Sequence, residues 1–184
     1  MDRVYLAFLE NTFAAARQIA LRSAAVRIRP EAAYPPRSYH CSFLVPYLQE
    51  QANGTVAAAA GPVDALIAFP QDYLCSVDPR LYMRVACILS PGFVHPNVLQ
   101  TGVVCLGAGF RPGTPIGELI WEMYLIVSYR NRTLDERNAL NAPACRLLRA
   151  NENIVAGFSA PPLLRRRRRP QALVRKSDGV ADGL

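Results

Sequence analysis

The most informative stretch of this chain is His95-Pro96-Asn97, followed after four residues by Gly102-Val103-Val104-Cys105-Leu106. It places a polar turn, a glycine and a thiol in a fixed register within twelve residues. A glycine leaves room for a sharp backbone turn and for the close approach of another chain. Because the thiolate of cysteine is a strong nucleophile, this setting makes Cys105 a candidate functional residue.

The apolar residues outside this stretch predict helices near both ends of the chain. In residues 3–22 they recur at steps of three and four, which is typical of an amphipathic helix. The expected buried face of this helix consists of Leu6, Leu9, Phe13, Ala16 and Ala20. A second helix is predicted after Thr114-Pro115, with threonine as N-cap and proline at the first helical position, and a third at residues 142–149. The buried face of the second helix is expected to contain Ile116, Leu119, Ile120, Met123 and Val127.

Between these helices the sequence predicts short strands. Four segments are rich in β-branched and aromatic residues, and they are residues 39–48, 55–60, 63–69 and 81–89. Turn signals at Asn53-Gly54 and Gly61-Pro62 favour a meander of antiparallel strands. A helix, four strands, an irregular segment around Cys105 and further helices together predict an α+β fold in one domain.

The positive charge of the chain is concentrated at its C-terminal end. The chain has 21 basic and 14 acidic side chains, a formal net charge of +7, and residues 160–184 contain seven of the basic and two of the acidic groups. Because this segment is rich in proline and arginine, we predict a folded domain at residues 1–159 and a disordered basic tail at residues 160–184. The arginine run that begins at Arg165 and ends at Arg169 is expected to bind an acidic partner surface, or nucleic acid without sequence specificity.

Cysteine and histidine usage argues against a metal site and a disulfide framework. The five cysteines are scattered without a Cys-x-x-Cys pair, and the only histidines are His40 and His95. No apolar run approaches the roughly 20 residues that cross a bilayer, and the N-terminus lacks the pattern of a signal peptide. Reduced thiols suit the cytoplasm. We therefore expect a cytoplasmic protein with no metal, no cofactor and no membrane partner.

The register from His95 to Cys105 resembles, position for position, the pattern around the active-site cysteine of ubiquitin-conjugating enzymes. Phe69-Pro70-Gln71-Asp72-Tyr73 is similar to the family's Phe-Pro-x-Asp-Tyr segment, and Leu140-Asn141-Ala142-Pro143-Ala144 to its Leu-Asn-Pro-x-Ala segment. Pro115 lies ten residues after Cys105, where the family has the proline of a Trp-Ser-Pro turn. The resemblance spans about residues 60–150. It implies the family fold, with an N-terminal helix, a four-stranded antiparallel meander and C-terminal helices.

This resemblance also implies roles for individual residues. Cys105 would carry the thioester, and the Asn97 amide would donate to the oxyanion that forms when an amine attacks. His95, Pro96 and Gly102 would support the turn. For Asn97 the alternative is a turn residue that bonds its own backbone, and for His95 it is a general base paired with the cysteine.

Some positions depart from the family pattern. Gly113-Thr114-Pro115 stands in place of Trp-Ser-Pro, and Leu74 stands where the family has a proline. The acidic residue that gates the family's site is displaced here, so Asp135 and Glu136 are the candidate gate residues. These departures suggest a divergent bacterial member that acts with a ubiquitin-like protein other than ubiquitin, in an antiviral defence system.

The sequence thus predicts a transferase of a ubiquitin-like conjugation pathway. Cys105 would accept the C-terminus of a ubiquitin-like protein from an activating enzyme and pass it to an amine on a protein target. Two alternatives remain open: a catalytically inactive variant of the fold that only binds the ubiquitin-like protein, and a nucleic-acid-binding protein in which Cys105 is a small apolar residue. The other cysteines lie in apolar segments and are expected to be structural, and they are Cys41, Cys75, Cys87 and Cys145.

Overall fold

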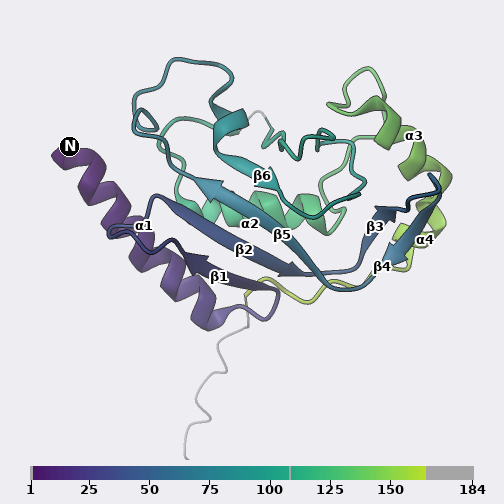
Figure 1. Ribbon diagram of the computed structural model, residues 1–184, viewed down its shortest axis with the longest axis horizontal. Coiled ribbons are helices and arrows are strands. Elements are labelled where there is room, and N and C mark those ends of the chain that lie inside the picture. Colours follow the sequence, from purple (N-terminus) through teal and green to yellow (C-terminus); the bar gives the residue numbers. More distant parts are fainter. Residues whose placement is uncertain (1, 108, 165–184) are drawn as a thin grey trace, which may run out of the picture.

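The fold is that of a computed structural model, which describes residues 2–107 and 109–164. It combines one antiparallel sheet of four strands, a separate two-stranded sheet and helices at both ends of the chain (Figure 1). The elements in chain order are α1 (Arg3–Arg22), β1 (Val26–Pro30), β2 (Ser38–Leu44), β3 (Tyr47–Glu50), β4 (Val56–Ala59), β5 (Pro62–Ala68), the 3-10 turn η1 (Leu81–Arg84), β6 (Ala86–Ile88), α2 (Ile116–Val127), α3 (Ala142–Ala150) and α4 (Glu152–Ala156). The predicted α+β fold is confirmed.

The strand order of the larger sheet is β1-β2-β5-β6, with every neighbouring pair antiparallel. Helix α1 packs beside β1, and α2 lies behind the sheet (Figure 1). The β3–β4 pair, α3 and α4 lie at the end of the molecule opposite the start of α1. Side chains on the inner face of the sheet alternate with exposed ones, as expected for a sheet that buries one face.

The predicted strands differ from the observed ones in three places. The segment at residues 39–48 forms two strands, β2 and β3, which bend apart at Pro46 because proline has no N–H for the ladder. The pairing register is nevertheless continuous, since Leu44 pairs with Pro62 and Tyr47 with Ala59. The segment at residues 81–89 begins as the η1 turn and becomes strand only at β6, and β1 was not predicted at all.

The helices follow the predicted pattern with small shifts. The buried face of α1 contains Tyr5, Leu9, Thr12 and Ala16, whereas the expected Leu6, Phe13 and Ala20 are only partly buried. The hydroxyl of Tyr5 donates 2.5 Å to the backbone oxygen of Phe69, which holds this side chain against the core. None of the helices in the described residues has the length and apolar character needed to cross a membrane.

Helix α2 buries every side chain predicted for its inner face. It begins one residue later than expected, with Pro115 as N-cap. The hydroxyl of Thr114 instead donates 2.7 Å to the backbone oxygen of Arg111, which closes the turn that precedes the helix. A capping threonine is therefore used for a loop rather than for the helix.

The folded part of the chain extends past the boundary that we placed at residue 159. Leu163 is buried, and its backbone oxygen accepts 2.5 Å from the hydroxyl of Ser23. The hydroxyl of Tyr124 donates to the backbone oxygen of Pro161. The arginine run and the rest of the predicted tail lie outside the described residues.

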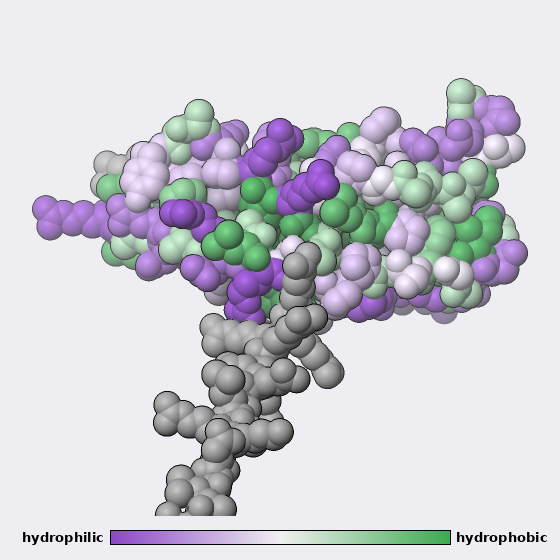
Figure 2. Space-filling model, turned by 90° about the horizontal axis from the view of Figure 1, so that it is seen from below, coloured by the Kyte–Doolittle hydropathy of each residue, from purple (hydrophilic) through white to green (hydrophobic). Residues whose placement is uncertain are grey.

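Figure 2 views the molecule from below, with hydrophilic side chains of α1 projecting at one end and apolar ones more frequent toward the end that holds β4 and α4.

Candidate active site

The thiol hairpin, which we define as residues 97–105, brings Asn97 and Cys105 side by side. The backbone N–H of Cys105 donates 2.8 Å to the oxygen of Asn97, and that of Leu99 donates 2.9 Å to Val103. A further hydrogen bond of 2.8 Å, from the N–H of Gly102 to the oxygen of Leu99, closes the turn. The fixed spacing seen in the sequence is therefore the spacing of a tight hairpin, which holds the amide residue directly across from the thiol.

Gly102 joins this hairpin to the sheet. Its φ of +86° lies in the left-handed region, and its backbone oxygen accepts 2.8 Å from the N–H of Ile88 in β6. A Cβ at this position would lie 2.2 Å from the backbone oxygen of Ile88 and 2.8 Å from the sulfur of Cys87. Both the conformation and the close approach therefore require glycine.

His95 is fully buried and supports the turn that leads into the hairpin. Its Nδ1 accepts 3.0 Å from the backbone N–H of Asn97, and its ring packs between Phe93 and Tyr129, with centroids 6.0 and 5.1 Å away. Burial, helped by the nearby Arg132, lowers the pKa of His95 to about 3. The imidazole is therefore neutral near pH 7 and turned toward the Asn97 backbone, an arrangement that favours a structural role over that of a general base.

The buried histidine predicts a pH dependence of stability. His95 titrates near its ordinary pKa of 6.5 in the unfolded chain and near 3 in the folded chain, so between these values the unfolded state binds the extra proton. The free energy of unfolding should therefore fall as the pH drops from 6.5 toward 3, by up to about 1.4 kcal/mol per pH unit. In His95→Asn the Oδ1 atom can still accept from the Asn97 N–H but does not titrate. Urea unfolding between pH 6.5 and 4.5 should show a shallower fall for the variant, and equal slopes would contradict the assignment.

Asn141, from the segment before α3, holds the turn from the other side. Its Nδ2 donates 2.9 Å to the backbone oxygen of Val98, and its backbone N–H donates 2.9 Å to Pro96. Its Oδ1 accepts 3.1 Å from the N–H of Ala144 and so caps α3. Sequence reasoning identified this segment by resemblance but did not find that one asparagine serves both the helix cap and the turn.

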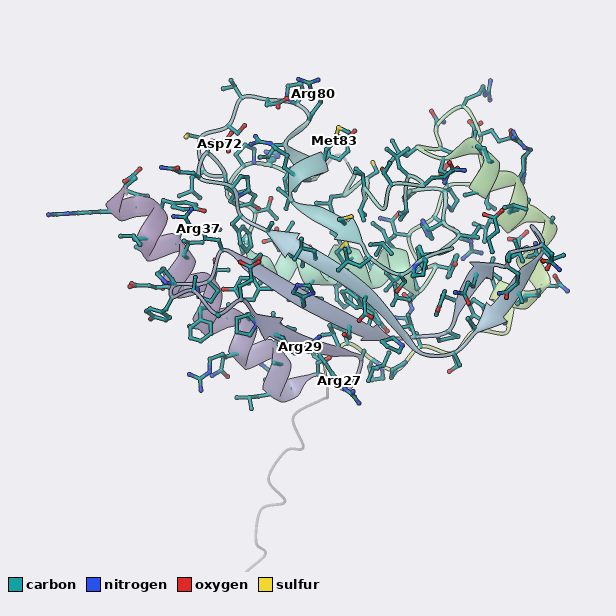
Figure 3. All side chains as sticks on the ribbon, viewed as in Figure 1. Arg27, Arg29, Arg37, Asp72, Arg80 and Met83 are labelled. Atoms are coloured by element: carbon teal, nitrogen blue, oxygen red, sulfur yellow. The ribbon has the colours of Figure 1, made fainter. Side chains whose placement is uncertain are left out.

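The segment at residues 69–73, also identified by resemblance, has a structural role. Tyr73 is buried, and its hydroxyl donates 2.6 Å to the backbone oxygen of Thr114 before α2. Asp72 lies on the loop that follows β5 (Figure 3) and forms an ion pair of 2.8 Å with Arg84 of η1. The segment thus fastens two loops to the core, near the helices rather than at the thiol.

The cysteines differ in accessibility. Cys105 is half-buried, whereas Cys41 and Cys145 are buried. Burial raises the pKa of Cys41 to about 12 and also raises the pKa values of Cys87 and Cys145, which makes these thiols poor nucleophiles at neutral pH. Cys75 is exposed, contrary to the apolar, structural setting that we expected. Within the described residues, no three His, Cys, Asp or Glu side chains are placed to hold a metal ion.

The carboxylates of the two candidate gate residues form hydrogen bonds and ion pairs with nearby residues. Asp135 accepts 3.0 Å from the backbone N–H of Arg137 and 2.9 Å from the amide of Asn138. Glu136 forms ion pairs with two arginines of α3, Arg146 at 2.7 Å and Arg149. The structure therefore ties Glu136 to α3 and Asp135 to its own loop.

A hollow of about 410 Å³ lies between the segment after Cys105 and helix α2. We call it the acidic pocket because, among the described residues, Glu118 and Glu122 are its only charged lining residues. Asn131 links it to the hairpin, since its Nδ2 lies 3.5 Å from Glu122 and its backbone oxygen accepts at 3.5 Å from the Asn97 amide. The remaining lining residues are Leu106, Gly107, Gly109, Phe110, Thr114, Gly117, Leu119 and Trp121.

Sequence reasoning did not find this pocket. Glu118 and Glu122 look like the solvated face of an amphipathic helix, because nothing in the sequence indicates what packs above them. The available signal was Trp121, the single tryptophan of the chain, which falls outside the buried period of α2 and is 46% exposed. An exposed tryptophan is a common feature of binding surfaces.

No protein-family model and no curated protein matches the chain. Among solved structures the chain is similar to the E2 domain of a Toxoplasma gondii ubiquitin conjugating enzyme, with a TM-score of 0.50 and 14% sequence identity over 81% of this chain and 89% of that one. The likeness shows that the chain has the fold of an E2 domain. This confirms the expected fold.

Proposed function

We propose that this chain is a transferase that conjugates a ubiquitin-like protein to its targets through a thioester on Cys105. The observation that carries the proposal is the thiol hairpin, in which the backbone of a half-buried cysteine pairs with that of Asn97 on an E2-type fold. The partners are an activating enzyme, a ubiquitin-like protein and a protein target. A scaffold that merely binds the modifier has no use for this pairing of a thiol with an amide.

The proposed reaction has two acyl transfers. In the first, the Cys105 thiolate attacks the thioester carbon on the activating enzyme, a new C–S bond forms and the old one breaks to release that enzyme's thiolate. In the second, an amine attacks the Cys105 thioester, the Asn97 Nδ2–H donates to the developing oxyanion, and the C–S bond breaks to return the Cys105 thiolate. The amine proton passes to solvent. Neutral His95 holds the turn and takes no part in the transfer.

The proposal extends to the biological setting suggested by the divergent sequence. It places the enzyme in the cytoplasm of a bacterium, with a dedicated modifier and activating enzyme in antiviral defence. Its supports are the replaced Trp-Ser-Pro turn at residues 113–115 and the low identity to the E2 domain above. We also keep two sequence proposals: a single domain, predicted at residues 1–159 and packed as far as Leu163, followed by a basic tail that binds an acidic partner or nucleic acid, and a gating role for Asp135 or Glu136.

The direct test is adduct formation. The chain is incubated with an activating enzyme, the ubiquitin-like protein that this enzyme activates, and ATP, and is then run on a non-reducing gel. The expected product is one adduct that disappears with thiol reductant and that mass spectrometry assigns to Cys105. If the activating enzyme is charged with the modifier but no adduct forms on this chain, the protein is a binding variant and the proposal is wrong.

Replacing Asn97 by alanine should separate charging from transfer. Removing a single oxyanion donor typically costs about a hundredfold in rate. We expect Asn97→Ala to charge normally and to discharge to free lysine about a hundredfold more slowly, measured by loss of the adduct over time. The matched control is Asn153→Ala, an exposed asparagine of α4. Equal discharge by Asn97→Ala and the wild type would leave Asn97 as a turn residue only.

A further inference from the structure

We propose that the acidic pocket binds a cationic side chain in the C-terminal tail of the modifier, so that the enzyme selects its modifier by charge. This inference rests on the proposed function, because it needs a tail attached to Cys105. It adds a specificity determinant, Glu118 with Glu122, which neither the sequence motifs nor the fold assigns.

The position of the pocket indicates which part of the substrate occupies it. Its lining starts at Leu106, the residue after Cys105, but includes neither Cys105 nor Asn97. An attacking amine must come within about 3 Å of the acyl carbon on the sulfur, so it does not sit in this pocket. A tail bound to the sulfur extends by about 3.3–3.6 Å per residue, so the residues just before its terminal one reach the pocket.

The charges of the pocket indicate what chemistry it accepts. Within residues 2–107 and 109–164 no basic side chain lines it and neither Glu118 nor Glu122 forms an ion pair, in contrast to Asp135 and Glu136. The two glutamates are also four residues apart on α2, where like charges repel and destabilise a helix. A cationic side chain between them would remove this repulsion.

The walls of the pocket suit a long cationic side chain. Phe110 and Leu119 offer apolar surface to an aliphatic stem, which arginine and lysine bury while their charged ends remain polar. Trp121 also lines the acidic pocket, and its aromatic ring can stack on a guanidinium. An arginine is therefore the occupant that fits best, with the stem on the walls and the charge at the glutamates.

Short synthetic peptide thioesters test this without an activating enzyme, because they can acylate Cys105 directly. Each peptide ends in a glycine thioester and carries arginine, glutamine or glutamate in turn at the second, third or fourth residue from the C-terminus. Arginine is chosen over lysine because its guanidinium does not attack the thioester. Acylation of the full chain is followed by intact mass. At one of these positions the arginine peptide should react about fivefold faster than the glutamate peptide, and high salt should reduce the difference.

Charge-changing variants of the pocket give the decisive comparison. In the double variant Glu118→Gln with Glu122→Gln the ratio of arginine to glutamate rates should fall to about one, and in Glu122→Arg the preference should reverse. Glu10→Gln, an exposed glutamate of α1, is the matched control and should keep the wild-type ratio. Thermal unfolding of each variant checks that the fold is retained. A wild-type ratio near one at all three positions, or an unchanged ratio in the double variant, overturns the inference.

A binding measurement separates this inference from the proposed function. In Cys105→Ala, peptide amides of the same sequences are titrated while the fluorescence of Trp121, the only tryptophan, is recorded. Tighter binding of the arginine peptide, lost in the double pocket variant, supports charge selection by the pocket. If at the same time no peptide thioester acylates Cys105, only the proposed thioester function is contradicted. Acylation of Cys105 at equal rates, together with equal binding of all peptides, keeps the thioester function and rejects the charge selection.

Discussion

Cys105→Ala should abolish the thiol-sensitive adduct, and Cys105→Ser should form an adduct that resists thiol reductant. The alanine variant has no nucleophile, whereas the serine hydroxyl forms an oxygen ester, which amines and thiols cleave far more slowly than a thioester. Both variants should fold, because Cys105 is half-buried and contributes to the hairpin through its backbone N–H rather than its sulfur. The measurement is the charging assay on reducing and non-reducing gels.

The matched controls are Cys75→Ala and Cys87→Ala. Cys75 is chosen because its thiol is exposed, and Cys87 because its sulfur lies beside Gly102 of the hairpin, although burial raises its pKa. Each control should charge like the wild type. Persistence of the adduct in Cys105→Ala, with loss in one of the controls, would move the nucleophile to that cysteine and contradict the proposed site.

Gly102→Ala should cause the largest loss of stability. The new Cβ would meet the Ile88 backbone oxygen at 2.2 Å, in a part of the sheet that cannot move without breaking the hydrogen bond between Ile88 and Gly102. Strain from the positive φ and overpacking each cost about 1–3 kcal/mol. We therefore expect the free energy of unfolding, measured with urea, to fall by about 2–6 kcal/mol, and the variant to charge poorly under native conditions.

The variant Gly54→Ala measures the cost of backbone strain at positive φ without the steric overlap expected at Gly102. Gly54 has a similar φ of +78°, but a Cβ there would have no atom within 4 Å. Its substitution should cost only the conformational part, about 1 kcal/mol. If both substitutions lower the free energy of unfolding by the same amount, the close packing of Gly102 against Ile88 of β6 does not contribute to stability, and the predicted collision is wrong.

Local patterns predicted helix α2 and the register of Asn97 and Cys105, but the segment around Cys105, expected to be irregular, forms a hairpin. The spacing between Asn97 and Cys105 is a property of neighbouring backbone, and the buried face of α2 follows a clear helical period, so both are visible in the sequence. Strand β1 was missed because its exposed Arg27 and Arg29 (Figure 3) leave a short alternation that ends at Pro30. Only its pairing with β2 makes it a strand.

The parts of the site that the sequence did not predict depend on contacts between distant segments. Glu122 and Asn131 are separated by the end of α2 and the loop after it, so their place beside Asn97 follows from tertiary packing. The two gate candidates were chosen by their position relative to the family pattern, but the arginines that engage Glu136 come from the next helix. Sequence spacing identifies Asn97 and Cys105 as candidate residues, but not which carboxylate lies near them.

The double use of Asn141 has a consequence for motion. Because the same side chain caps α3 and fastens the backbone at Val98, opening of the first turn of α3 and loosening of the thiol hairpin are parts of one cooperative event rather than two independent ones. The protected amides of both segments should therefore exchange with solvent hydrogen at a common rate. A partner protein that binds α3 would therefore change the rigidity of the hairpin that carries Cys105, without any contact near the sulfur.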